Sequence, residues 1–129
     1  MSEHKTAAGP LEGLRVLDIS TMLAGPYGAT LLGDLGADVI RVESHYGDES
    51  RHLGPMRGTE RGPYLSLNRN KRDIVIDLQQ EDSREVFARL VATADVLITN
   101  IREPALSKLG LNYAQVAALK ADIVWIGVT

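Results

Sequence analysis

The stretch Leu17–Pro26, LDISTMLAGP, decides the fold because it joins a buried strand to the start of a helix. The strand, Arg15–Ser20, is a short run of mainly branched apolar residues, and Pro26 suits the first turn of a helix. Dinucleotide-binding folds keep a glycine-rich phosphate loop, G-x-G-x-x-G, at such a turn. This turn contains the single glycine Gly25, so a nicotinamide or flavin dinucleotide has weak support.

The same turn still has features that suit a ligand. The first N–H groups of a helix are unpaired and attract an anion or a carbonyl oxygen. The small residues Ala24 and Gly25 would let a ligand approach the backbone. A tight strand-to-helix connection without any ligand is the alternative, and the spacing alone favours that alternative.

The rest of the chain alternates between strand and helix patterns. Apolar runs in the first two strands favour a parallel sheet that is covered on both faces. The alternation predicts right-handed βαβ units and an α/β fold, with a Rossmann-like, doubly wound parallel sheet of about five strands. The predicted strands are Arg15–Ser20, Asp38–Glu43, Asp73–Leu78, Asp95–Asn100 and Asp122–Thr129.

The predicted helices lie between these strands. The first runs from Gly25 to about Gly36, and two shorter pieces late in the chain are separated by Gly110. The helix between the third and fourth strands is amphipathic. It covers Gln80–Ala94, and its expected apolar face holds Val86, Leu90 and Val91.

The domain organisation is simple. Residues 1–11 are a polar leader that is expected to be disordered, and residues 12–129 form one domain. Residues 44–68 are rich in glycine and proline and are expected to be a long functional or mobile loop. Because the chain stops at a strand with no helix after it, we interpret it as the N-terminal part of a larger protein.

Composition excludes several classes of protein. The net charge of −3 argues against a nucleic-acid-binding protein, and the absence of cysteine excludes disulfides and thiolate metal sites. The three histidines have no metal-ligand spacing, so no metal is expected. No apolar run approaches 18 residues, which predicts no membrane span, and the N-terminus lacks a signal peptide. These features are typical of a cytoplasmic protein.

Charge is unevenly distributed along the chain. Residues 41–72 carry seven basic and four acidic side chains, which suggests attraction for a small anion such as a nucleotide phosphate. Arg69, Lys71 and Arg72 precede a strand and could clamp phosphates, or they could be exposed charges without a ligand. Asn100 could meet a ligand at the edge of the sheet or cap the next segment. Asp18, inside a strand, is read as a structural carboxylate.

Several stretches in order resemble the class III CoA-transferase family, also called the CaiB/BaiF family. This family includes formyl-CoA transferase, carnitine CoA-transferase and α-methylacyl-CoA racemase. The similarity runs from about Leu11 to Thr129. The matching stretches are LEGLRVLDIS (11–20), AGPYGATLLGDLGADVIRVE (24–43), GDESR (47–51), LNRNKRDIVIDL (67–78) and ADVLITNIREPALSKLGL (94–111).

The resemblance implies a site for coenzyme A or an acyl-CoA, bound as substrate. The implied contacts are Met22, Leu23 and Ala24 near the thioester, Ile76, Asp77, Gln79, Asn100 and Ile101 around the adenosine, and Arg51, Lys108 and Leu109 as further contacts, with Lys108 on a phosphate. Two departures from the family pattern affect this edge. The chain reads NIREPA at 100–105 where the family usually has NFRPG, and Ser44 stands where some relatives have an arginine.

The resemblance also implies a reaction. Transferases of this family use an aspartate nucleophile to move CoA between an acyl-CoA and a carboxylic acid, through an aspartyl-acyl intermediate. In the family order that aspartate lies beyond Thr129, so no catalytic residue is assigned here and residues 1–129 alone are expected to be inactive. The full-length protein would be an interlocked homodimer. The alternatives are an α-methylacyl-CoA racemase of the same family and a non-catalytic acyl-CoA- or nucleotide-binding module.

Overall fold

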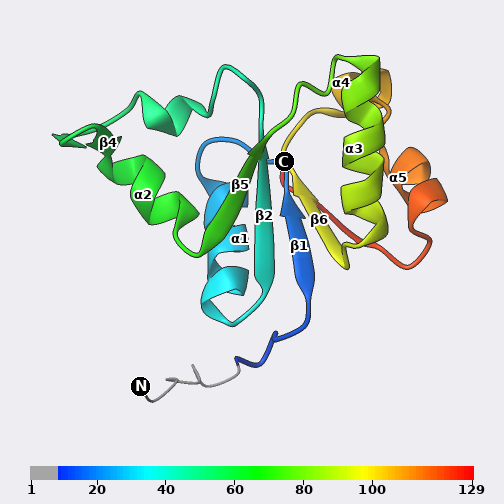
Figure 1. The fold of residues 1–129 in the computed structure, drawn as a ribbon, viewed down its shortest axis with the longest axis horizontal. Helices are drawn as coiled ribbons and strands as arrows, with labels where there is room; N and C mark the ends of the chain where they lie inside the picture. Colours follow the sequence, from blue (N-terminus) through cyan, green and yellow to red (C-terminus); the bar gives the residue numbers. More distant parts are fainter. Residues whose placement is uncertain (1–8) are drawn as a thin grey trace.

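A parallel five-stranded sheet forms the centre of the protein (Figure 1). The structure, a computed structural model, describes residues 9–129. The strand order is β5-β2-β1-β6-β7, so the chain builds outward from β1 in one direction and then in the other. The strands are β1 (Arg15–Asp18), β2 (Asp38–Glu43), β5 (Lys71–Val75), β6 (Val96–Thr99) and β7 (Val124–Gly127). The predicted doubly wound α/β fold is confirmed.

Helices cover both faces of this sheet (Figure 1). The first face is covered by α1 (Ala24–Asp34), against which α2 (Gly62–Asn68) packs, and the second by α3 (Glu81–Ala92), α4 (Glu103–Leu109) and α5 (Tyr113–Leu119). Side chains on β1 alternate between the two faces, as a strand requires. Val16 packs in the core beneath α1, whereas Leu17 packs in the larger core beneath α3, α4 and α5.

The third strand of the sheet begins two residues earlier than the sequence predicted. It covers Lys71–Val75 and pairs with Val39–Glu43 of β2, whereas Asp73–Leu78 was expected. After Ile76, whose N–H still donates to the Glu43 carbonyl, the chain turns away from β2. The apolar residues that follow β5 therefore lie beyond the edge of the sheet instead of within it.

The buried face of α3 also differs from the prediction. Phe87 and Val91 are buried, whereas Val86 is 45% exposed. Phe87 and Val91 are four residues apart and share one helix face, while Val86 points about 100° away from Phe87. The predicted helix is confirmed, but Phe87, and not Val86, anchors it to the core.

The segment 44–68 is more structured than a long loop. It contains a 3₁₀ turn at Glu49–Arg51, a small hairpin formed by β3 (Met56–Arg57) and β4 (Glu60–Arg61), and α2. The predicted leader, residues 1–11, falls largely outside the described residues. Its last residue, Leu11, is held by a hydrogen bond from its N–H to the Leu35 carbonyl.

The break between the two late helices falls at the predicted glycine. Gly110 ends α4 in the left-handed conformation, at φ 76°, which a glycine adopts without steric cost. Asn112 then begins α5 through a capping box with Gln115. Within residues 9–129, no helix has the length and apolar character that crossing a membrane requires.

The packing of α3 gives the first testable prediction. Phe87→Ala should lower the free energy of unfolding by about 3–5 kcal/mol because it leaves a cavity in the main core. Val86→Ala, the neighbouring control, should change it by less than about 0.5 kcal/mol because Val86 is 45% exposed and lies off the buried face of α3. Urea unfolding measures both values, and equal effects would contradict the observed orientation of α3.

Candidate functional site at the carboxyl edge of the sheet

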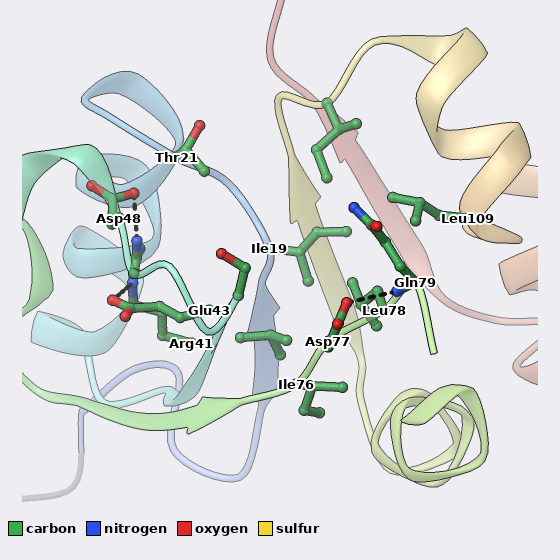
Figure 2. Close-up of a pocket in the computed structure, with 14 residues that line it drawn as sticks. Ile19, Thr21, Arg41, Glu43, Asp48, Ile76, Asp77, Leu78, Gln79 and Leu109 are labelled. Carbon is green, nitrogen blue, oxygen red and sulfur yellow. Dashed lines mark hydrogen bonds and ion pairs between the residues drawn. The ribbon is translucent and has the colours of Figure 1, made fainter. Parts of the chain in front are cut away.

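A cavity of about 180 Å³ opens at the carboxyl ends of the strands. Figure 2 shows it between Asp48, which lies in the loop after β2, and the segment that follows β5, which includes Asp77 and Gln79. It lies near the point between β1 and β6 where the strand order reverses, which is where open α/β sheets bind their ligands. Its apolar lining is Ile19, Val42, Ile76, Leu78, Ile101 and Leu109, and its polar residues include Thr21, Ser44, Asp77 and Gln79.

A second, larger cavity of about 630 Å³ lies beside the first, beyond β6. Ile101 lines both cavities. Thr21 lines the first cavity and Ala24 the second, so the turn between β1 and α1 contributes a wall to each. The other residues around the second cavity include Thr99, Asn100, Arg102, Tyr113, Trp125 and Val128.

Asn100 joins the ends of β1 and β6 between the two cavities. Its side-chain oxygen accepts the Thr21 N–H at 3.0 Å, and its side-chain nitrogen donates to the Thr21 carbonyl at 2.9 Å. The alternative reading of Asn100 as a helix cap is wrong, because Arg102 occupies the N-cap position of α4. The amide of Asn100 instead fixes the position of the turn relative to β6.

The single glycine of the turn has a steric reason. A side-chain carbon at Gly25 would lie 2.4 Å from the side chain of Ser20, so only glycine lets α1 begin so close to the end of β1. Ser20 is itself held by Asp18, whose Oδ1 accepts the N–H of Ser20 at 3.0 Å and also its hydroxyl. The glycine is therefore required by the close packing of the turn, and it is not part of a glycine-rich phosphate loop.

A buried ionic cluster lies beneath the first cavity. The Arg41 guanidinium reaches Asp48 at 2.6 Å, Glu43 at 3.1 Å and Asp18 at 3.5 Å. Lys71 adds a second cation, with its Nζ 2.8 Å from Asp18 Oδ2. Asp18 is thus the structural carboxylate that the sequence indicated.

Burial and pairing oppose one another in the pKa values of this cluster. Burial raises the pKa of Asp48, but hydrogen bonds from Ser50 and the charge of Arg41 outweigh it, so the pKa lies below its usual 3.8. For Lys71, burial lowers the pKa and the attraction of Asp18 does not fully offset it. Burial likewise disfavours the charge on Arg41, but Asp18, Glu43 and Asp48 together raise its pKa.

The basic middle of the chain is largely paired with the protein's own carboxylates. Lys71 forms an ion pair with Asp18. Arg69 pairs with Asp34 at 2.6 Å. Arg72 pairs with Asp38, also at 2.6 Å. The alternative, that these are exposed charges, agrees with the structure for Arg69 and Arg72, whose side chains are 45% and 64% exposed. It is wrong for Lys71, whose side chain is 1% exposed. The three side chains connect β5 and its leading turn to α1, β1 and β2.

The structure brings together some of the predicted contact residues and separates others. The first cavity gathers Ile76, Asp77, Gln79, Ile101 and Leu109. The second gathers Ala24, Asn100 and Ile101.

Four predicted contacts line neither cavity: Met22, Leu23, Arg51 and Lys108. Lys108 is exposed in the last turn of α4, beside Leu109. Arg51 forms an ion pair with Glu43 at 3.0 Å and lies 3.7 Å above the Tyr64 ring.

Sequence reasoning missed several residues of the first cavity. Ile19, Thr21 and Val42 line it, and each lies at or just after the carboxyl end of a strand. That position is a signal that the sequence carried, because all parallel strands end at the same edge. No group of His, Asp or Glu side chains within residues 9–129 has an arrangement suited to a metal ion.

Comparison with known proteins identifies the family of this fold and site. The family model described as CoA-transferase family III matches residues 11–129. The chain belongs to this family. The resemblance seen in the sequence is therefore confirmed.

Two curated relatives to which the chain is similar are named as CoA-transferases. The chain is 38% identical over 118 residues to an acetyl-CoA:oxalate CoA-transferase of Acetobacter aceti, covering 91% of this chain and 30% of that protein. It is 39% identical over 122 residues to a succinyl-CoA:glutarate CoA-transferase of Homo sapiens, covering 93% of this chain and 28% of that protein. The chain thus spans about a third or less of the length of these relatives.

A solved structure agrees with the fold described above. The crystal structure of a CaiB/BaiF family protein from Brucella suis superposes with a TM-score of 0.89 at 39% sequence identity. The match covers 95% of this chain and 34% of that chain.

The buried cluster predicts unequal effects of removing two arginines. Arg41→Met should lower the free energy of unfolding by about 3–5 kcal/mol because it leaves buried carboxylates without their cation. Arg72→Met removes an exposed arginine paired with Asp38 and should cost less than about 1 kcal/mol. Urea unfolding compares the two, and a small effect at Arg41 would contradict the role of the cluster.

The free energy of unfolding should fall in acid, over a range of pH that the carboxylate pKa values define. The pKa values of Asp38 and Asp48 lie below 3.8 in the folded protein, so the unfolded chain takes up protons first as the pH falls. The stabilisation from these carboxylates is therefore complete above about pH 5 and is lost as the pH falls through 3.8 toward their folded-state values. Thermal unfolding between about pH 3 and pH 6 measures it, and a constant melting temperature over that range would contradict it.

Proposed function

We propose that this chain forms the nucleotide-binding part of an acyl-CoA site in a CoA-transferase, which moves CoA between an acyl-CoA and a carboxylic acid. The observation that carries the proposal is the apolar cavity at the carboxyl edge, with its polar rim and a larger cavity beside it. CoA has a flat purine with polar substituents at one end and a long flexible arm at the other. Two adjoining cavities of unequal size suit such a ligand.

In this proposal the adenosine occupies the first cavity. The side chains of Ile76, Ile101 and Leu109 offer apolar surface to the purine. Asp77 and Gln79 offer an acceptor and an amide to the ribose and the purine edge. The Asp77 side chain is already oriented, because its Oδ1 accepts the Gln79 N–H at 3.0 Å.

The pantetheine arm would then cross Asn100 and Ile101 into the second cavity. This path brings the thioester toward Ala24 and the neighbouring residues Met22 and Leu23 at the first turn. Lys108 would attract a phosphate group at the mouth of the first cavity, since it is exposed beside Leu109. Arg51 would act mainly through Glu43, to which it is bound, and so support the loop beside the cavity.

The chemistry would be supplied by a residue outside this chain. An aspartate carboxylate would attack the thioester carbonyl and the C–S bond would break, which gives an aspartyl-acyl mixed anhydride and free CoA thiolate. The thiolate would attack the aspartyl carbonyl of this anhydride, which forms an aspartyl-CoA thioester and releases the donor carboxylate. The acceptor carboxylate would attack that thioester to give a second mixed anhydride and free thiolate. The thiolate would then attack the acyl carbon of the acceptor, which forms the new CoA thioester and restores the aspartate. We further propose a cytoplasmic enzyme that forms the interlocked homodimer implied by the family, and no transfer by residues 1–129 alone.

The names of the relatives favour transfer over racemisation and point to small dicarboxylates. One relative acts on oxalate, and others act on glutarate and on L-malate, each with acetyl-CoA or succinyl-CoA. We therefore propose a short dicarboxylic acid as the CoA acceptor.

Binding of CoA tests the proposal. Isothermal titration of the full-length protein with CoA should show binding, and Ile101→Trp should weaken it at least about tenfold by filling the space between the cavities. Leu119→Trp, on the exposed side of α5, is the matched control and should leave the affinity unchanged. Lys108→Ala should weaken binding about threefold and reduce its dependence on salt.

Transfer from succinyl-CoA to glutarate and from acetyl-CoA to oxalate, followed by separation of the CoA esters, tests the reaction. Absence of CoA binding, or binding that Ile101→Trp does not affect, would contradict the proposed site. Binding with racemisation of an α-methyl-branched acyl-CoA, and without transfer, would favour the alternative reaction.

A further inference from the structure

The turn between β1 and α1 is held at two consecutive backbone positions by two different loops. Asn100, after β6, pairs with both backbone groups of Thr21. Asp48, in the loop after β2, accepts the next N–H along the chain, that of Met22, at 3.2 Å. The turn is therefore fixed from both sides of the site by side chains that are remote in the sequence.

Met22 adopts a conformation that its side chain does not favour. Its φ is 67°, in the left-handed region, where a residue with a Cβ is in steric conflict with the following carbonyl. The neighbouring contacts must therefore offset the cost of this conformation. The hydrogen bond to Asp48 is the contact made by the Met22 backbone itself.

Asp48 is placed to hold that backbone firmly. Its side chain is 1% exposed. One carboxylate oxygen accepts the N–H of Ser50 at 2.8 Å and also the Ser50 hydroxyl, and the other accepts from Arg41 at 2.6 Å and from Met22. Both oxygens are thus occupied, and the carboxylate cannot rotate without breaking several hydrogen bonds.

Arg41 connects this carboxylate to the sheet. It projects from β2 and also pairs with Asp18 on β1, so Asp48 is positioned relative to two strands. Figure 2 shows Arg41 and Asp48 together on the side of the first cavity that Thr21 borders. A shift of Asp48 would therefore displace both the turn and the wall of the first cavity.

The position of the turn matters because it borders both cavities. Thr21 lines the first cavity and Ala24 lines the second, with the left-handed Met22 between them. We propose that Asp48 is a positioning residue that holds Met22 in its left-handed conformation and so sets the wall between the two cavities before CoA binds. This inference rests on the proposed function for its ligand, but the state of the turn can be measured without one.

The test combines hydrogen exchange with CoA binding in the full-length protein. Asp48→Asn removes the negative charge that attracts the Met22 N–H and loosens the contact with Arg41. Exchange followed by mass spectrometry should accelerate at least about tenfold in a peptide that spans residues 17–27. A peptide from α3, residues 81–92, should be unchanged and reports that the fold is intact.

Affinity for CoA should fall about tenfold in Asp48→Asn. Asp34→Asn, which breaks the exposed pair with Arg69, is the matched control and should change neither quantity. If Asp48→Asn does not fold, Ser50→Ala replaces it in the exchange experiment. This variant removes one hydroxyl donor to Asp48 and keeps the negative charge of Asp48. Ser50→Ala should also accelerate exchange at residues 17–27, by a smaller factor than Asp48→Asn.

A conformational role can be separated from a general structural one by rescue. Met22→Gly removes the steric cost of the left-handed conformation. It should restore part of the CoA affinity lost in Asp48→Asn, although it gives no such gain in the wild-type background. Rescue supports the proposal, and its absence would show that Asp48 stabilises the protein without setting the turn.

The remaining outcomes are distinct. Unchanged exchange at residues 17–27 in the variants, or faster exchange with unchanged CoA affinity, would overturn the proposal. If the wild-type protein does not bind CoA, the proposed function fails, and the exchange rates alone decide whether Asp48 holds the turn.

Discussion

The buried guanidinium of Arg41 is the constraint on which the edge of the sheet depends. An arginine stays charged inside a protein, so its burial requires carboxylates at close range. Asp18 and Glu43, on neighbouring strands, and Asp48, in the following loop, meet this requirement, each within 3.5 Å. Lys71 and Arg51 pair with two of these carboxylates and complete the balance of charge. The ends of β1 and β2 and the loop after β2 are thereby held in one arrangement.

This arrangement determines what a ligand would meet. The ionic cluster uses most of the charged groups near the first cavity for internal pairing, which leaves that cavity mainly apolar with a polar rim. Such a surface favours a purine over a bare phosphate, because it offers area for packing and few free cations. The proposed nucleotide end of CoA is consistent with this balance, and in that proposal the exposed Lys108 supplies the cation for a phosphate group.

Much of the fold followed from local patterns, and the errors have identifiable causes. The strand and helix order was predicted because short β-branched runs alternate with helical periodicity. Val86 and Phe87 are both apolar neighbours in α3, so the sequence could not tell which one the sheet would cover. The third strand was placed too late because Ile76 and Leu78 continue its apolar pattern. Residue pairing with β2 ends at Val75, with a last hydrogen bond from the Ile76 N–H, and no local signal marks that point.

The sequence by itself determined that strands and helices alternate and that polar residues such as Asp77 and Asn100 follow the strands. Parallel strands end at one edge, so this order already placed several site residues together. Only the tertiary structure decided the partners of the charges and the conformation of the turn. Met22 and Asp48 are 26 residues apart, and Thr21 and Asn100 are 79 apart. Contacts at such separations exist only once the sheet has formed, because the strand order, and not the local sequence, brings these residues within hydrogen-bonding distance.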